Sequence, residues 1–222
     1  VLNPADKYQV ETFLEDQYDA ITNQIKLHSP DVIALQECPE DFADNLPKFH
    51  PEYVWHTNCC HNNWYVIVGT KGSSTLHSKL SFVDSKSSGK GMISVKWNSH
   101  IVSCIHLPFL KKGGYESFNT VLKTLGENVL IAGDFNVCDR ATLPPGKHYW
   151  DCLEKLFDET SSSHLKHDEN TDGSLKTLNG ELKNYDHLVF AEKYSSTSFR
   201  CWNAENAFAD GCPSDHVPTL YT

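Results

Sequence analysis

The sequence contains the stretch Val129-Leu130-Ile131-Ala132-Gly133-Asp134-Phe135-Asn136, in which a short apolar run passes directly into polar residues. A continuous apolar run of this length, bounded by a glycine, is typical of a strand that is buried on both faces. Asp134 and Asn136 therefore follow the end of a buried strand. Strand ends at one rim of a sheet are positions where a rigid scaffold can hold several polar groups in a fixed arrangement.

Acidic or histidine residues take the same position at four other places in the chain. They lie beside apolar, strand-like runs at Glu37, His106, Asp186 and the adjacent pair Asp215 and His216. Any one of these positions is explained by a strand that ends in a polar turn, because Asp and Asn favour turns. All five places together indicate a shared site. Glu and Asp are hard oxygen ligands for Mg²⁺ or Mn²⁺, and an Asp can orient a His that exchanges a proton with water.

The spacing of apolar residues predicts few helices and many strands. Helices are predicted over residues 8–27, 115–125 and 149–157, and strands over 32–35, 53–56, 64–70, 75–83, 91–97, 99–106, 129–132, 185–190, 196–202 and 216–221. The polar residues 160–181 are predicted to form a long surface loop. Strands and helices in this mixed order indicate one α+β domain over residues 1–222, with two packed β-sheets and helices outside them.

The charge of the chain restricts its partners. Its 222 residues carry a formal net charge of −10, from 19 basic and 29 acidic residues. Most of such a surface repels the phosphates of a nucleic acid or of an anionic membrane. A phosphate ester substrate then requires a local inversion of the field, which a bound divalent cation supplies. No apolar stretch approaches the ~18–20 residues of a membrane span, and no signal peptide is visible.

The cysteine pattern favours free thiols. The chain has eight cysteines, and those in or beside apolar runs are Cys38, Cys104, Cys138 and Cys201. There a free cysteine behaves as a small hydrophobic residue. The stretch Cys59-Cys60-His61 lacks the paired spacing of a zinc site. We therefore expect an intracellular, reducing compartment such as the cytoplasm.

Three motifs, taken in chain order, resemble those of the endonuclease/exonuclease/phosphatase superfamily, whose fold is DNase I-like: Gln36-Glu37, Gly133-Asp134-Phe135-Asn136 and Ser214-Asp215-His216. Two intermediate motifs of that superfamily are similar to Ile105-His106-Leu107 and Tyr185-Asp186-His187. The opening residues Val1-Leu2-Asn3-Pro4, followed by Asp6-Lys7-Tyr8, are similar to openings in the deadenylase-like branch, so we expect that branch to be the nearest. The resemblance implies a four-layer α/β sandwich, in which two packed mixed β-sheets are flanked by helices. It also implies that the superfamily's first-strand asparagine precedes Val1, in a strand that is truncated here.

The resemblance implies a metal site and a catalytic histidine. Glu37 would be the principal ligand of Mg²⁺ or Mn²⁺, and Asp215 would lie near the metal. His216 would be the catalytic histidine, held in place by Asp186. The reaction would be in-line attack of water on phosphorus, with the metal and the histidine neutralising the charge that grows on the phosphate oxygens.

The remaining candidate residues would act on the water and the phosphate. Asp134 would align or activate the attacking water, Asn136 would help hold the phosphate, and His106 would contact it. Whether Asp134 or His216 takes the proton from water stays open.

The resemblance gives the reaction but leaves the substrate open. We expect a Mg²⁺-dependent phosphodiesterase that acts on RNA or single-stranded nucleic acid, where base stacking contributes more than charge. Aromatic residues that could stack on bases, or simply pack, are Trp55, Trp64, Tyr149, Trp150 and Trp202. One alternative is a phosphatase or phosphodiesterase for a small-molecule or lipid-headgroup phosphate ester. A second is a non-catalytic binding module on the same fold.

Overall fold

The computed structural model describes residues 18–61, 63–82, 90–109, 113–125, 129–136, 157, 165–167, 175–176, 182–183, 185–191, 198–200 and 219–221. Residues 18–28 are helical. The elements that follow are β1 (Val32–Pro39), α2 (Glu40–Phe49), β2 (Tyr53–His61), β3 (Trp64–Lys71), β4 (Ser74–Ser81), β5 (Gly91–Trp97), β6 (His100–His106), α3 (Gly114–Leu125), β7 (Val129–Asp134), β8 (Leu165–His167), β9 (Leu175–Lys176), β10 (Leu182–Lys183), β11 (Asp186–Ala191), β12 (Ser198–Arg200) and β13 (Thr219–Tyr221).

The larger sheet has six strands in the order β4-β5-β6-β7-β11-β8. Its neighbours are antiparallel except β6 and β7, which run parallel and are joined through α3. A parallel pair needs a crossover connection, and a helix on one face of the sheet is the usual one. The larger sheet is therefore mixed, as the family resemblance implied for both sheets.

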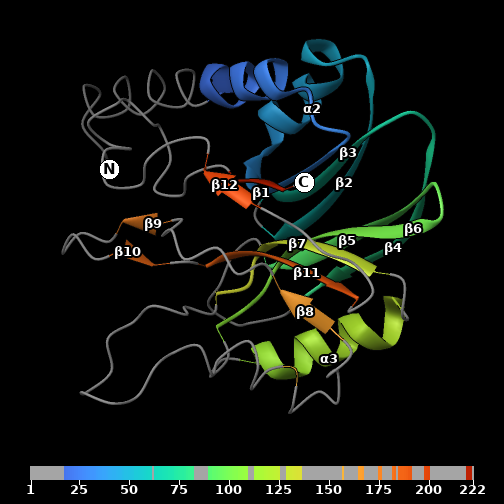
Figure 1. The fold of residues 1–222 in the computed structure, drawn as a ribbon, viewed down its shortest axis with the longest axis vertical. Coiled ribbons are helices and arrows are strands. Elements are labelled where there is room, and N and C mark those ends of the chain that lie inside the picture. The colour runs from blue at the N-terminus through green and yellow to red at the C-terminus, as the bar shows by residue number, and fades with distance from the viewer. Residues whose placement is uncertain are drawn as a thin grey trace.

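The smaller sheet has the order β1-β3-β2, and both of its pairings are antiparallel. It packs face to face on the larger sheet (Figure 1). Polar side chains link the two sheets: the Asn58 amide of β2 donates to the carbonyl oxygens of Leu80 and Met92, at 2.9 and 3.0 Å. The Cys104 thiol of β6 donates to the Leu35 carbonyl of β1 at 3.2 Å. These bonds fix how the sheets lie relative to each other.

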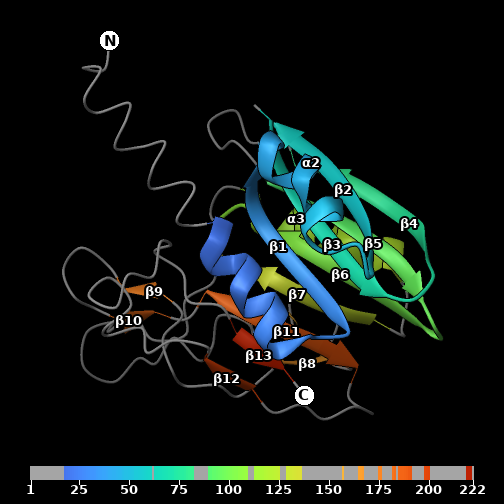
Figure 2. The same ribbon diagram turned by 90° about the horizontal axis from the view of Figure 1, so that it is seen from above.

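Apolar side chains fill three successive layers. Between the sheets lie Val66, Val68, Ile93, Val95, Val102 and Cys104. Between the larger sheet and α3 lie residues that include Ile105, Ile131, Phe118, Val121 and Leu125. On the outer face of the smaller sheet, α2 buries Phe42, Ala43 and Leu46 against Ile67. Helix, sheet, sheet and helix therefore form the four-layer α/β sandwich that was expected (Figure 1), and Figure 2 shows residues 18–28 and α2 over the smaller sheet.

The helices agree with the sequence in part. Helix α3 covers the predicted 115–125, and residues 18–28 contain the end of the predicted 8–27, whose earlier part lies outside the described residues. Helix α2 was not predicted. Its apolar residues have helical spacing and its first turn is acidic, but Pro47 lies inside it. A proline inside a helix removes one hydrogen bond, and such a residue normally argues against a helix.

The prediction that residues 160–181 form a surface loop is wrong where the structure describes them, because this range contains the strands β8 and β9. Leu165–His167 forms β8, an edge strand that pairs with β11. Leu165 is 4% exposed and belongs to the core beneath the larger sheet. The loop prediction relied on the polar composition of the segment. The segment nevertheless pairs with β11 and buries Leu165.

Candidate active site

Three candidate residues lie side by side across the larger sheet. In the pairing register, His106 at the end of β6 lies opposite Asp134 of β7, and Asp134 lies opposite Asp186 of β11. Directly paired residues on neighbouring strands point to the same face of a sheet. That face is the one toward the smaller sheet, because Val102 and Cys104, at alternate positions before His106, lie in the core between the sheets. The sequence prediction that these strand ends share one rim is thereby met for these three positions.

Glu37 reaches the same rim through an irregularity in β1. Leu35 pairs with Ile67 but Cys38 pairs with Tyr65, so β1 has one extra residue at this point. Glu37 has φ of +52°, in the left-handed region that non-glycine residues seldom occupy. Such a bulge reverses the alternation of side chains along the strand.

The consequence of the bulge is that two consecutive side chains face β6. The Gln36 amide donates to the Cys104 thiol at 3.0 Å, and Glu37 Oε1 lies 3.7 Å from His106 Nε2. In a regular strand one of these two side chains would face the helices. The side chain of Glu37 is 62% exposed, so its carboxylate stands at the open edge of the rim.

Asp134 and Asn136 form a tight polar turn. Asp134 Oδ1 accepts from the Asn136 backbone N–H at 2.7 Å, and its Oδ2 accepts from the Asn136 amide at 3.2 Å. The same amide donates to the Leu107 carbonyl at 2.7 Å. Asn136 has φ of +51°, a conformation that asparagine tolerates better than most residues. The carboxylate is thus fixed in orientation and is almost buried, with residue exposure of 8%.

Gly133 allows the close approach of β6 and β7 just before this turn. Its φ is +142°, and a Cβ atom there would lie 2.0 Å from the Ile105 carbonyl oxygen. No side chain fits in that space. The glycine of the Gly-Asp-Phe-Asn motif is therefore required by packing, because it lets β6 and β7 approach closely enough to bring His106 and Asp134 together.

His106 is at the centre of the described site. It is fully buried, and its Nε2 lies 3.3 Å from Asp134 Oδ2 and 3.7 Å from Glu37 Oε1. The same Nε2 contacts the Lys90 ammonium nitrogen. Lys90 directly precedes β5 and is 8% exposed. Burial lowers the pKa of Lys90, whereas the charges of Asp134 and Glu37 raise it and offset part of that effect.

Lys90 was missed by the sequence analysis. The only signal was a lysine between two glycines at the start of an apolar strand. That pattern is usual for an exposed strand end, and only the contact with His106 and the burial of Lys90 show that its side chain turns inward. Asp215 and His216, which were predicted to complete the site, lie outside the described residues.

The carboxylate of Glu37 has the chemistry of a ligand for a divalent cation. Among the described residues, no group of three or more His, Cys, Asp or Glu side chains could hold a metal ion. Mg²⁺, however, is commonly bound by one or two protein carboxylates, with water and substrate oxygens completing its coordination. An exposed carboxylate is a ligand of that kind, so Glu37 fits such an ion, and Asp215 stays a predicted second ligand.

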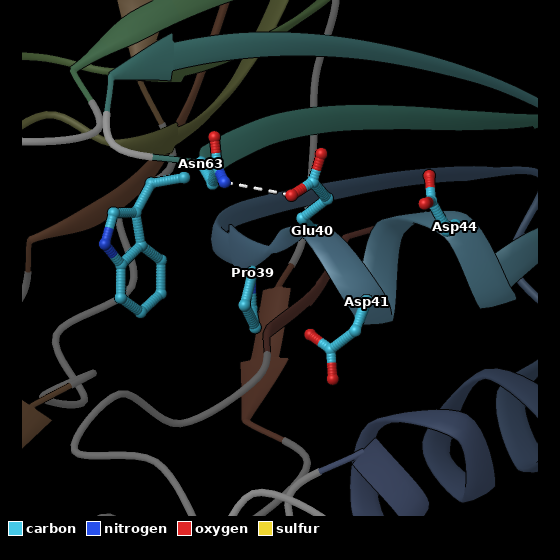
Figure 3. Close-up of a pocket in the computed structure, with 6 residues that line it drawn as sticks. Pro39, Glu40, Asp41, Asp44 and Asn63 are labelled. Carbon is cyan, nitrogen blue, oxygen red and sulfur yellow. Dashed lines mark hydrogen bonds between the residues drawn. The ribbon is translucent and has the colours of Figure 1, made fainter.

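A shallow hollow lies where β1 passes into α2 (Figure 3). It is lined by Pro39, Glu40, Asp41, Asp44, Asn63 and Trp64. The Asn63 amide donates to Glu40 Oε2 at 2.9 Å. The hollow includes none of the candidate catalytic residues.

Of the predicted stacking residues, Trp55 packs inside the fold, against Gly69 and Tyr53, and donates its indole N–H to the His50 carbonyl at 3.1 Å. Trp64 is 36% exposed at the hollow. Tyr149, Trp150 and Trp202 lie outside the described residues.

Solved structures with this architecture include enzymes with different substrates. A humanized zebrafish (D. rerio) TDP2 carrying 14 mutations is 15% identical, with a TM-score of 0.63 over 94% of this chain and 90% of that one. D. rerio TDP2 complexed with a single-strand DNA product is 14% identical, with a TM-score of 0.64 over 94% and 91%. A mannosyl-6-phosphatase of Bacteroides thetaiotaomicron is 14% identical, with a TM-score of 0.66 over 99% and 94%. At these identities the likeness shows the fold alone.

The four-layer sandwich is the fold that this chain shares with these enzymes, and the match to a family of phosphoric ester hydrolases gives the reaction class. The sequence pattern of the Endonuclease/Exonuclease/phosphatase family matches residues 12–216, and the chain belongs to this family. No curated protein matches the sequence.

Proposed function

We propose that this protein hydrolyses phosphodiester bonds with a divalent cation, and that its substrate is single-stranded nucleic acid, RNA above all. The family supplies the reaction class, phosphoric ester hydrolysis. The observation that supports the proposal most directly is the row of His106, Asp134 and Asp186 on one sheet face, with Glu37 turned toward it by the bulge.

In this proposal Asp134 aligns the attacking water. Both of its oxygens already accept hydrogen bonds from Asn136, so the carboxylate enters the reaction in a fixed orientation. Its Oδ2 also faces His106. A fixed acceptor at hydrogen-bond distance from a water molecule can direct the oxygen lone pair at phosphorus and receive the proton. His106, in the same cluster, contacts a phosphate oxygen, and Asn136 helps to hold the phosphate.

Glu37 and Asp215 would hold the cation, and Asp186 would hold His216 in the orientation needed to exchange a proton. When bound, the cation neutralises charge on the phosphate oxygens. Asp186 lies in register with Asp134 and therefore shares its sheet face. A carboxylate beside an imidazole fixes the orientation of the ring and favours its charged form.

The substrate proposal rests on the chemistry of single strands. The net charge of −10 disfavours a long duplex, which presents a high density of phosphates. The likeness to a TDP2 bound to single-strand DNA supports a single-stranded substrate, and the exposed Trp64 offers a face for base stacking. The deadenylase-like branch and the preference for RNA are parts of the proposal that the opening residues of the chain suggest. A reducing, intracellular setting is also proposed, and the four described cysteines are free thiols.

A panel of substrates tests this function. The protein is incubated with each substrate in Mg²⁺ and in EDTA. The substrates are an end-labelled single-stranded RNA, the matching DNA strand, the matching duplex and a set of phosphate monoesters that includes mannose 6-phosphate. We expect cleavage of the single strands, RNA first, in Mg²⁺ only. Hydrolysis of the monoesters alone would replace the proposal with a small-molecule phosphatase, which the likeness to a mannosyl-6-phosphatase makes the second candidate. No hydrolysis in any reaction would favour a binding module.

A further inference from the structure

We propose that Lys90 is a phosphate-binding residue, whose ammonium group contacts a non-bridging oxygen of the substrate phosphate beside His106. The inference rests on the proposed function, because it assigns a new residue to the same site. It also names what that residue recognises, which is the negative charge of the phosphate and no feature of the base or sugar.

The burial of Lys90 requires an explanation. Lysine is almost never fully buried unless it is paired, and its long stem normally lets the charged end reach water. Lys90 is nevertheless only 8% exposed, and its ammonium nitrogen contacts His106 Nε2. An imidazole is neutral or positive and therefore cannot neutralise a lysine. The ammonium group is thus directed into the site without a partner that cancels its charge at that contact.

The backbone holds Lys90 in this position. Its carbonyl accepts a hydrogen bond from the Phe82 N–H at 3.1 Å, and the next residue, Gly91, pairs with His106 across β5 and β6. A Cβ atom on Gly91 would lie 2.4 Å from the Cys60 sulfur, so the strand start is closely packed. The backbone of Lys90 is therefore held beside the start of β5 by Phe82 and by the pairing of Gly91.

The charges around Lys90 fit a phosphate site. Asp134 and Glu37 are close enough to act on its charge, and Asp134 is the residue proposed to align the water. A rim of carboxylates alone would repel a phosphate group, and a cation bound at Glu37 neutralises only its own side of the rim. An ammonium group beside His106 supplies positive charge on the larger sheet, next to the proposed position of the water. In a site shielded from bulk water such a charge acts strongly on phosphate oxygens.

A purely structural role for Lys90 makes a different prediction. If Lys90 served only as a counter-charge for the carboxylates, its removal would destabilise the fold and leave phosphate affinity unchanged. If it binds phosphate, Lys90→Met keeps most of the apolar stem, retains or gains stability, and loses phosphate affinity. Lys96, which is exposed on the same strand β5, gives the matched control Lys96→Met.

Titration calorimetry with inorganic phosphate in EDTA measures binding without metal or turnover. We expect Lys90→Met to weaken phosphate binding about 10- to 100-fold, the usual size for a hydrogen bond to a charged group. Lys90→Arg should restore part of the affinity because it keeps the charge, and Lys96→Met should match the wild type. If Lys90→Met does not fold, Lys90→Gln is measured in its place.

Cleavage of single-stranded RNA in Mg²⁺ is measured on the same proteins, which separates the two proposals. Lys90-dependent phosphate binding in a protein that cleaves nothing would contradict the proposed function and support the role of Lys90. If the wild type cleaves RNA, and Lys90→Met binds phosphate and cleaves RNA as well as the control Lys96→Met, the role of Lys90 is overturned. The proposed function is then unaffected. A wild-type protein that binds no phosphate would overturn it as well.

Discussion

At the scale of single residues, Glu37 combines a candidate metal-ligand role with a strained backbone. Its φ of +52° is disfavoured for any residue with a Cβ atom, by about 1–2 kcal/mol. Strain of this kind persists where the surrounding structure imposes it, and it is often found at functional sites. The bulge that creates the strain is also what turns the carboxylate toward His106.

The strain at Glu37 can be measured by substitution. Glu37→Gly should be more stable than Glu37→Ala by about 1 kcal/mol, because glycine adopts a positive φ without steric conflict. Urea unfolding of the two variants gives this difference. Equal stability, or a more stable alanine variant, would mean that β1 relaxes without strain when the carboxylate is removed.

Lys90 should make the stability of the protein depend on pH. Burial is the largest effect on its pKa and lowers it from the ordinary value of 10.5, so the unfolded chain holds the proton more tightly than the folded one. Stability therefore rises with pH from the lowered pKa up to about that value. We expect Lys90→Met to be more stable than the wild type at neutral pH, with an advantage that shrinks as the pH approaches 10.5. Thermal melts of both proteins between neutral pH and pH 10.5 measure this difference in stability. A Lys90→Met variant that is less stable than the wild type at every pH would contradict the expectation.

At the scale of elements, β8 shows how little sequence is needed to extend a sheet. Leu165→Ala should lower the free energy of unfolding by about 2–5 kcal/mol, because Leu165 is buried beneath the sheet. The exposed neighbour gives the control Lys166→Ala, which should change it by no more than about 0.5 kcal/mol. Denaturant unfolding measures the stability of both variants. If Leu165→Ala loses as little free energy of unfolding as the control, the original interpretation of this segment as a loop is restored.

The sequence alone predicted the elements whose apolar pattern was continuous or periodic. The runs at 32–35 and 129–132, together with the motifs that follow them, located the rim and the residues Glu37, Asp134 and Asn136. The bulge in β1, the inward turn of Lys90 and the pairing of β8 were not predictable in this way. Each depends on register between strands distant in the sequence, which local composition does not encode.

For the whole molecule, the fold explains where the site lies, and the net charge restricts how the substrate binds. The sandwich brings the ends of β1, β6, β7 and β11 to one rim, and the family gives phosphoric ester hydrolysis. The single domain expected over residues 1–222 stays a prediction. Within the described residues, no helix has both the length and the apolar character to cross a membrane. With a net charge of −10, the chain should bind its substrate mainly through local groups at the rim.

The central claim is that this rim hydrolyses a phosphodiester bond through a cation held by Glu37. The most direct test is cleavage of an end-labelled single-stranded RNA by the wild type, by Glu37→Gln and by the control Glu116→Gln, an exposed residue of α3. Each protein is assayed in Mg²⁺ and in EDTA. We predict cleavage by the wild type and the control in Mg²⁺ only, and a loss on the order of 10²–10³ for a Glu37→Gln protein that melts close to the wild type. Undiminished cleavage by Glu37→Gln, or cleavage in EDTA, would contradict the claim.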